Sequence, residues 1–129
     1  MTPRRFIHSG SPWEELAGYA RAVVDGRWIF VSGTVGADLS TGRFAPSAGA
    51  QAAQALDIIA AALAQADASL ADVVRVRVYV PDRADVAAVS AVLKERMAGN
   101  RPANTTVCCP LAVEEAKVEI EVTARRRDA

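Results

Sequence analysis

Apolar and polar side chains alternate along six short stretches of the chain, and a period of two is typical of β-strands. The pattern predicts strands at residues 4–8, 19–24, 28–31, 73–80, 101–109 and 117–124. Asp25 and Gly26 separate the second strand from the third, and this dipeptide is typical of a tight hairpin turn. A turn near residues 110–115 is expected to join the last two strands as a pair.

Two other stretches follow a helical period. Residues 48–66 carry one apolar stripe, and four polar side chains are expected largely off it: Gln51, Gln54, Asp57 and Gln65. A second helix is predicted to run to about Met97, with Asp82 or Asp85 capping its first turn. Its inward positions are expected to be Val86, Val89, Val92 or Leu93, and Met97. Gly99 and Asn100 are expected to end it.

The order of these elements predicts one α/β domain over residues 1–129, with two helices on one face of a single mixed β-sheet. The length of 129 residues, 51% of them hydrophobic, fits one domain with its own core. Helices on one side leave the other sheet face open to solvent or to another subunit. Because the side chains on that face are mixed, we expect self-association into a closed cyclic oligomer.

The last two predicted strands carry unusual polar side chains. On the first of them, Asn104, Thr106 and Cys108 share one face. On the second, Val118, Ile120 and Val122 are expected in the core, while Glu119, Glu121 and Thr123 point the other way. We expect this strand pair to line a cleft for a small molecule, because such sites place a few polar groups on a rigid frame.

Charge and cysteine content narrow the class of protein. Lys and Arg number 15, as do Asp and Glu, so the net charge is zero and no basic face predicts binding to nucleic acid or to a membrane. The basic run Arg125–Arg127 is expected to be a solvated tail. Cys108 and Cys109 are adjacent, which disfavours a disulfide between them, and no metal-ligand spacing is present. No long apolar segment or leader pattern occurs, so we expect a cytoplasmic protein without a metal.

The chain resembles the Rid family of reactive-intermediate deaminases, also called the YjgF family, over about residues 19–126. The resemblance lies in the order of short motifs: Tyr19, Asp25-Gly26, Val31-Ser32-Gly33, Thr41-Gly42, Gln51 to Leu56, Leu70 to Val74, Val78-Tyr79-Val80, Arg101-Pro102-Ala103 and Val118 to Val122. It implies a chorismate-mutase-like α/β fold and a homotrimer with small-molecule clefts between neighbouring subunits. In active members these clefts hydrolyse enamines and imines to 2-oxo acids and ammonia, without a cofactor.

Some positions match the family and others depart from it. Glu119 matches the glutamate that positions water, and Gly33 and Tyr19 match cleft positions. Asn104 stands where deaminating members carry an arginine that binds the substrate carboxylate through two charged hydrogen bonds, which an uncharged amide cannot replace. The family's cysteine two residues later is Thr106, and a helix position that often carries asparagine is Ser90. The resemblance therefore implies a retained cleft with altered chemistry.

Each candidate also has a purely structural interpretation. Glu119 could be an ordinary strand carboxylate or form an ion pair with Arg75 or Arg77 at a subunit interface. Asn104 and Thr106 could satisfy one another's hydrogen bonds or those of the backbone at a trimer seam.

Cys108 fits a small buried hydrophobic residue better than a reactive thiol. His8, the only histidine, accompanies no nucleophile motif and is treated as incidental. Trp13 and Trp28 are expected to be packing residues, with a cleft mouth as the other position for Trp13.

Three functions remain open. The first is a hydrolase of an uncharged or differently shaped imine-like or carbonyl substrate, with Glu119 activating water and Asn104, Thr106, Tyr19, Gly33, Ser90 and Cys108 lining the cleft. The second is a metabolite-binding or regulatory trimer without catalysis. The third is the usual 2-imino acid deaminase, with Arg101 or Arg75 replacing the missing arginine, although Arg101 lies on the opposite side of a regular strand from Asn104.

Overall fold

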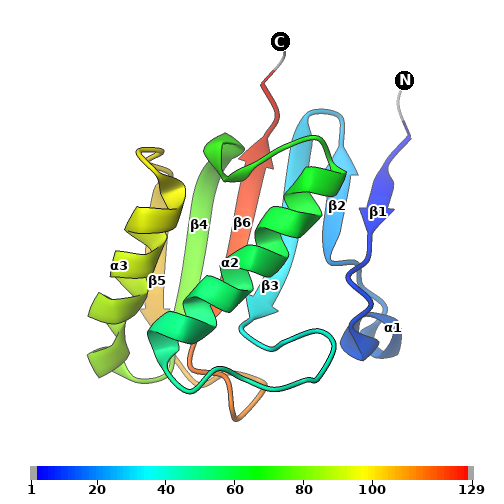
Figure 1. The fold of residues 1–129 in the computed structure, drawn as a ribbon. Coiled ribbons are helices and arrows are strands. Elements are labelled where there is room, and N and C mark those ends of the chain that lie inside the picture. Colours follow the sequence, from blue (N-terminus) through cyan, green and yellow to red (C-terminus); the bar gives the residue numbers. More distant parts are fainter. Residues whose placement is uncertain (1–2, 128–129) are drawn as a thin grey trace.

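The computed structural model describes residues 3–127, so the first two and last two residues of the expected domain lie outside it. A six-stranded sheet carries two long helices on one face, and a short helix lies near the edge strand β1 (Figure 1). The strands are β1 (Arg5–Ile7), β2 (Ala22–Asp25), β3 (Trp28–Val35), β4 (Val73–Val80), β5 (Ala103–Cys108) and β6 (Glu119–Arg125). The helices are α1 (Pro12–Ala17), α2 (Ala48–Gln65) and α3 (Val86–Met97), with 3-10 turns at Leu70–Asp72 and Arg83–Asp85.

The strand order is β1-β2-β3-β6-β4-β5, and only β4 and β5 run parallel. The predicted pairing of the last two strands is therefore wrong, because β4 lies between β5 and β6. Helix α3 connects β4 to β5 and places these strands side by side, as a parallel crossover does. Residues 109–118 then carry the chain past β4 to the position between β3 and β4.

Helix α1 is the element that the alternation pattern missed. Six residues are too few for a helical period to show, but the local signals are present. The Ser11 side chain accepts a hydrogen bond from the Trp13 amide, Pro12 occupies the first turn, and Gly18 ends the helix with a φ of 72°. The expected strand at residues 19–24 accordingly begins only at Ala22.

The core lies between α2, α3 and the facing side of the sheet. Val118, Ile120 and Val122 are buried as predicted, and so are Val89, Leu93 and Met97 of α3. The helix side of the sheet is thus the apolar side. Asp82 supplies the predicted cap, on the 3-10 turn that leads into α3.

Gln51 corrects the predicted polar face of α2, since its side chain is 1% exposed. Its amide nitrogen donates to the carbonyls of Ala45 at 2.9 Å and Glu115 at 3.3 Å, and its oxygen accepts from the Lys117 amide at 2.7 Å. These bonds attach the segment that precedes β6 to the start of α2. A buried amide is tolerated here because both of its ends are satisfied.

The basic run near the C-terminus is not a free tail. Arg125 belongs to β6 and lies 5.8 Å from the Trp28 ring centroid. The Arg126 amide donates to the Arg27 carbonyl at 2.8 Å, and Arg127 pairs with Asp72 at 3.4 Å. The run therefore continues strand β6 and contacts neighbouring turns.

Candidate functional site

Glu119 lies at the start of β6, on the sheet face that carries no helix. Its strand neighbours in register are Val35 on β3 and Tyr79 on β4. The β3–β6 pairing is irregular between Val31 and Thr34, and Gly33 lies in this bulge. A Cβ atom on Gly33 would be 2.3 Å from Oε2 of Glu119. The absence of a side chain at Gly33 is thus what lets the Glu119 carboxylate lie against the backbone.

The surroundings of Glu119 raise its pKa above the ordinary glutamate value. Burial is the main cause, the negative charge of Glu121 adds to it, and the positive charge of Arg21 opposes it. Within residues 3–127 of one chain, Glu119 forms no ion pair with Arg75 or Arg77, and a pair across a subunit interface stays a prediction. A half-buried carboxylate with a raised pKa is a suitable proton acceptor and donor.

Glu121 has a different role from Glu119. The hydroxyl of Tyr79 donates to its carboxylate in a short hydrogen bond, and this bond together with burial raises the pKa of Tyr79. Glu121 also lies beside Arg77 in the register of β4 and β6. Its carboxylate is therefore held by β4, in agreement with the structural interpretation.

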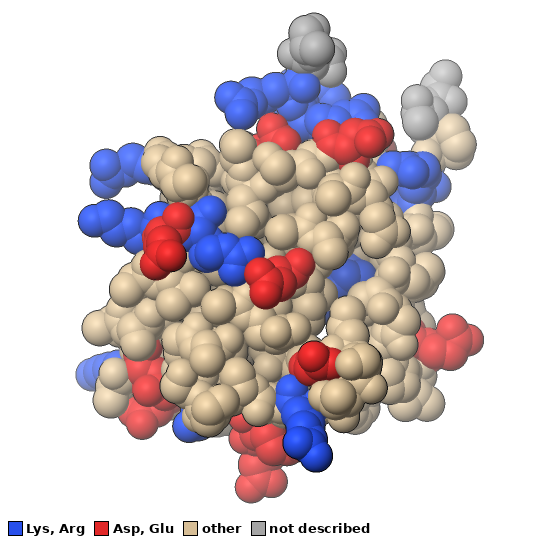
Figure 2. All heavy atoms as spheres, viewed as in Figure 1, with Lys and Arg blue, Asp and Glu red and all other residues tan. Residues whose placement is uncertain are grey.

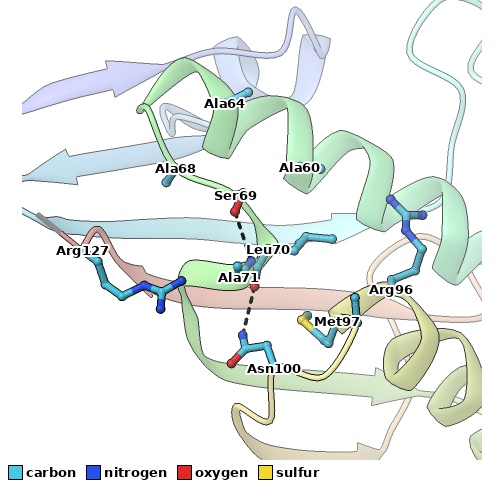
Figure 3. Close-up of a pocket in the computed structure, with 11 residues that line it drawn as sticks. Ala60, Ala64, Ala68, Ser69, Leu70, Ala71, Arg96, Met97, Asn100 and Arg127 are labelled. Atoms are coloured by element: carbon cyan, nitrogen blue, oxygen red, sulfur yellow. Dashed lines mark hydrogen bonds between the residues drawn. The ribbon is translucent and has the colours of Figure 1, made fainter. Parts of the chain in front are cut away.

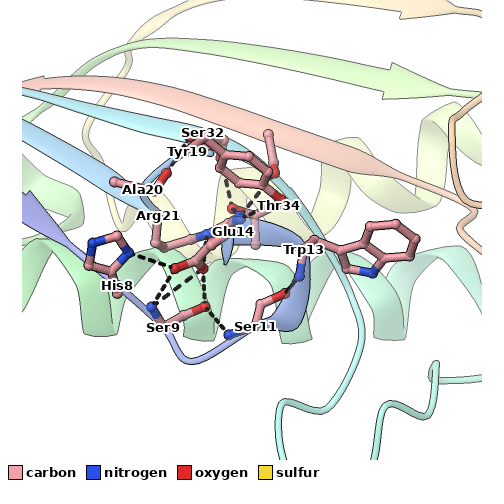
Figure 4. A network of polar contacts seen from close by, with 11 residues as sticks. His8, Ser9, Ser11, Trp13, Glu14, Tyr19, Ala20, Arg21, Ser32 and Thr34 are labelled. Atoms are coloured by element: carbon pink, nitrogen blue, oxygen red, sulfur yellow. Dashed lines mark hydrogen bonds and ion pairs between the residues drawn. The ribbon is translucent and has the colours of Figure 1, made fainter. Parts of the chain in front are cut away.

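A buried polar network near Gly33 contains residues that the sequence reasoning missed (Figure 4). Arg21 donates to the Gly33 carbonyl at 2.9 Å, to Thr34 Oγ1 at 2.8 Å and to the Tyr19 hydroxyl at 3.4 Å. Its Nε pairs with Glu14 at 3.3 Å. Tyr19 and Gly33 are thus joined by one guanidinium group.

Glu14 comes from the overlooked helix α1 and is buried. Burial alone would raise the pKa of Glu14, but hydrogen bonds from the Ser9 hydroxyl and amide and the charge of Arg21 hold that pKa below its ordinary value. His8 Nδ1 lies 3.2 Å from the same carboxylate. His8 is therefore part of this network rather than incidental.

Asn104, Thr106 and Cys108 occupy the other side of the sheet. They pair in register with Val76, Val78 and Val80, which face the core under the helices. Directly paired residues share a face. Thr106, Val78 and Ile120 therefore lie on the helix side, whereas Val107, Tyr79 and Glu119 lie on the open side. One chain does not bring Asn104 and Glu119 together.

All six residues of β5 are exposed in the isolated chain. The interpretation of Cys108 as a small buried residue is therefore not supported, since its side chain is exposed. The expected mutual bond is confirmed, because Thr106 Oγ1 donates to Asn104 Oδ1 at 2.8 Å. Ser90 and Asn104 line a common hollow of about 560 Å³ between α3 and β5, together with Lys94 and Arg101. Tyr19, Gly33 and Glu119 do not line this hollow.

A second hollow, of about 590 Å³, lies between α2, the turn at Leu70–Asp72 and the end of α3 (Figure 3). Its polar side chains already have partners: Asn100 donates to two carbonyls, and Arg96 and Arg127 pair with Asp57 and Asp72. No predicted site residue lines it.

Residues 11–126, nearly the whole of this chain, match the family model described as endoribonuclease L-PSP. This is the YjgF/Rid family. The chain belongs to it. A 2-iminobutanoate/2-iminopropanoate deaminase of Rattus norvegicus is 30% identical over 122 residues, 94% of this chain and 89% of that protein.

Solved structures of Rid-family proteins have the same fold. A YjgF/YER057c/UK114-family protein from Mycobacterium tuberculosis superposes with a TM-score of 0.86 at 36% identity, over 95% of this chain and 99% of the other. RidA from an Antarctic Psychrobacter superposes with a TM-score of 0.79 at 31% identity, over 83% and 87% of the two chains. The predicted family and α/β fold are confirmed, with three helices rather than two.

In this Rid-family chain, the helix-bearing face carries interspersed acidic and basic side chains (Figure 2). Among the described residues, no helix is long and apolar enough to cross a membrane.

One feature of the sequence could have pointed to burial of Arg21 and Glu14: both are charged residues directly beside apolar segments that must pack. Exposure cannot be read from such a pattern, so the buried ion pair appeared only in the structure.

Proposed function

We propose that this Rid-family protein is a cofactor-independent hydrolase of an uncharged imine, enamine or related carbonyl metabolite, and that Glu119 activates the attacking water. The position of the Glu119 carboxylate carries the proposal: it is half-buried, lies against Gly33 and has a raised pKa. A general base is most effective when its pKa approaches the working pH. The similar rat protein, named an imine deaminase, supports the same class of reaction.

In the proposed reaction, Glu119 takes a proton from water while the water oxygen attacks the carbon of the C=N bond. Glu119 passes that proton to the nitrogen, which gives a neutral carbinolamine and ionised Glu119. Glu119 then takes the hydroxyl proton of the carbinolamine and passes it to the amine nitrogen, so that the carbonyl forms, the C–N bond breaks and ammonia leaves. One imine and one water thus give one carbonyl compound and one ammonia, with no net change at Glu119.

Asn104 supports an uncharged substrate. Its Oδ1 accepts a hydrogen bond from Thr106, which orients the amide so that Nδ2 is the group available to a ligand. A neutral donor suits a carbonyl, ester or amide oxygen. It lacks the charge and two-pronged geometry by which an arginine binds a carboxylate.

We propose a homotrimer in which each site forms between two subunits. The open sheet face supports association, because Phe6, Trp28, Phe30 and Val107 are between 41% and 62% exposed there. The division of the candidate residues supports the same assembly. Glu119 lies on the open face of one chain, and the helix side of β5 in a neighbouring chain would bring Asn104, Thr106 and Ser90 to it.

A non-catalytic metabolite-binding or regulatory trimer is the second candidate. Asn104 favours it, since a neutral amide can bind a metabolite but does not supply the charge of the arginine that stands there in deaminating members. The usual 2-imino acid deaminase is the third. It would need another cation for the carboxylate. Arg75 is exposed on the open face, and Arg101 lines the same hollow as Asn104.

Ammonia release separates these candidates. The substrates are freshly generated 2-aminoacrylate, a longer 2-imino acid and the methyl ester of each. The variants are Glu119→Gln and Asn104→Arg, with exposed Glu115→Gln as the matched control. We expect the wild type and the control to prefer the esters, Glu119→Gln to be inactive, and Asn104→Arg to shift the preference toward the acids.

The other outcomes are equally informative. A wild type that hydrolyses the acids as well as the esters is the usual deaminase. If the wild type is inactive on all four compounds and Asn104→Arg gains activity on the acids, the cleft is intact and its natural ligand is a different compound. Full activity in Glu119→Gln would overturn the assignment of the base.

A further inference from the structure

Arg21 is a charged side chain almost completely withdrawn from solvent, with 5% of its surface exposed. Its guanidinium contacts Glu14 of α1, the Gly33 carbonyl and Thr34 Oγ1 of β3, and the Tyr19 hydroxyl (Figure 4). It also lies 5.5 Å from the Tyr19 ring centroid. Buried arginines need partners for charge and for hydrogen bonds, and this one has both.

Glu14 holds Arg21 in this position. The Glu14 carboxylate is fixed by Ser9, whose amide donates at 3.1 Å and whose hydroxyl donates in a short bond, and by His8 at 3.2 Å. The segment before α1 and α1 itself are thereby joined to the start of β2. The guanidinium is thus held from one side and presents its remaining donors to Tyr19 and β3.

One of the groups that Arg21 contacts, Gly33, lies beside Glu119. Gly33 is the residue whose missing side chain leaves room for the Glu119 carboxylate, and Arg21 holds the carbonyl of this same residue. Other charged or titratable groups also face this carboxylate. Glu121 comes from its own strand, Tyr79 lies beside it on β4, and Arg77 is paired in register with Glu121.

We propose that Arg21, clamped by Glu14, is a positioning residue of the cleft: it holds the Gly33 carbonyl, which lies beside Glu119, joins it to the Tyr19 hydroxyl, and supplies the positive charge that opposes Glu121. The catalytic part of this inference rests on the proposed function. The electrostatic and geometric part does not, because it concerns groups of the protein alone.

The positive charge of Arg21 lowers the pKa of Glu119, against the larger effects of burial and Glu121. Removing that charge should therefore raise this pKa further. Because Glu119 must be ionised to accept a proton from water, the acid limb of kcat/KM should move to higher pH by the same amount.

The test is an NMR titration of the Glu119 carboxyl carbon in the purified protein, which needs no substrate. The variants are Arg21→Lys, which keeps the charge, Arg21→Gln, and the double variant Glu14→Gln with Arg21→Gln. The double variant leaves no unpaired buried carboxylate and thus protects folding. Arg4→Gln, which removes one partner of the exposed Arg4–Asp25 pair, is the control.

We expect the pKa of Glu119 to rise in both glutamine variants and to stay at the wild-type value in Arg21→Lys and Arg4→Gln. The Gly33 carbonyl carbon should also change its chemical shift in the Lys variant, because one ammonium cannot keep the Nη1 bonds to Gly33 and Thr34 together with the Nε bond to Glu14 and the Nη2 bond to Tyr19. An unchanged pKa of Glu119 in the folded double variant would overturn the inference. A shifted pKa in a protein inactive on every imine would leave it standing and reject the proposed hydrolase.

Discussion

Glu119 and Asn104 face opposite sides of the sheet, although only β4 separates the strands that carry them. The register of β4 with its two neighbours shows this, because Tyr79 and Glu119 share one face of the sheet while Val76 and Asn104 share the other. A strand pair alternates strictly, so no side-chain rotation brings these two groups together through the sheet. Any site that uses both must draw them from two copies of the chain.

The exposed side chain of Phe30 offers a test of the proposed association between chains. It is 47% exposed on the open face and stacks on Trp28 with 6.4 Å between ring centroids. Phe30→Asp should leave the fold of the monomer intact, because the side chain is not in the core. It should dissociate the proposed trimer, because it would place a charge in the interface that the proposal assigns to this face. Light scattering should report a species of three chains of 13.6 kDa for the wild type and one chain for the variant. Ala61→Lys on the exposed side of α2 is the control and should remain trimeric, and an associated Phe30→Asp would exclude this face as the interface.

Gly33→Ala should separate activity from stability. The new Cβ would lie 2.3 Å from Glu119 Oε2, the end of a flexible side chain, so the carboxylate moves and the backbone does not. We expect a loss of about 1 kcal/mol or less in the free energy of unfolding, with activity reduced by about 10- to 100-fold through displacement of the base.

Two other glycines calibrate that result. At Gly36 a Cβ would lie 2.2 Å from the Gln51 carbonyl oxygen, a backbone atom that cannot move away, so Gly36→Ala should destabilise by about 3 kcal/mol or more. At Gly49 on α2 the nearest atom is 3.8 Å away, so Gly49→Ala should be neutral or stabilise by up to about 1 kcal/mol. Thermal unfolding measures all three, and a Gly33 variant as unstable as the Gly36 variant would show that the backbone had moved.

Glu119→Gln should raise stability at neutral pH while it removes activity. Burial and Glu121 raise the pKa of Glu119 in the folded state above its unfolded value, so the folded protein binds this proton more tightly. Stability from this group is therefore full below the unfolded pKa, near 4.5, and declines as pH rises through the folded pKa. The gain in Tm of Glu119→Gln over the wild type should appear at pH 7 and shrink toward pH 4. A gain that is the same at both values would mean that charge is not its cause.

Gln51 should be the most costly polar residue of α2 to remove. Gln51→Ala loses two donated bonds and one accepted bond and leaves buried backbone groups of residues 45, 115 and 117 without their partner. We expect a loss of about 2 to 4 kcal/mol in the free energy of unfolding. Gln54→Ala, one turn along the same helix and half-buried, should change it by about 0.5 kcal/mol or less. Equal effects in urea titrations would contradict the structural role of Gln51.

The period of the apolar residues was enough to locate β1, the β2–β3 hairpin, α2, β4, α3 and β6, and to assign Val118, Ile120 and Val122 to the core. Those features depend on local side-chain alternation, which one strand or helix expresses by itself. The order of short motifs was enough for the family and singled out Glu119, Gly33 and Tyr19; the structure places Gly33 against Glu119, and Arg21 joins Gly33 to Tyr19. A bond between Thr106 and Asn104 was one of two structural interpretations of these residues, and the structure contains it.

Only the tertiary structure decided which strands are neighbours and which charges are buried. The insertion of β6 between β3 and β4 depends on a crossover and on the bonds of Gln51, which act over 64 and 66 residues of sequence. The pairing of Glu14 with Arg21 depends on how the chain turns back between α1 and β2. The local sequence pattern around a charged residue does not distinguish a buried ion pair from a solvated one. Long-range contacts carry no periodic signal, so the faces of the sheet on which Asn104 and Glu119 lie became visible only with strand order and register.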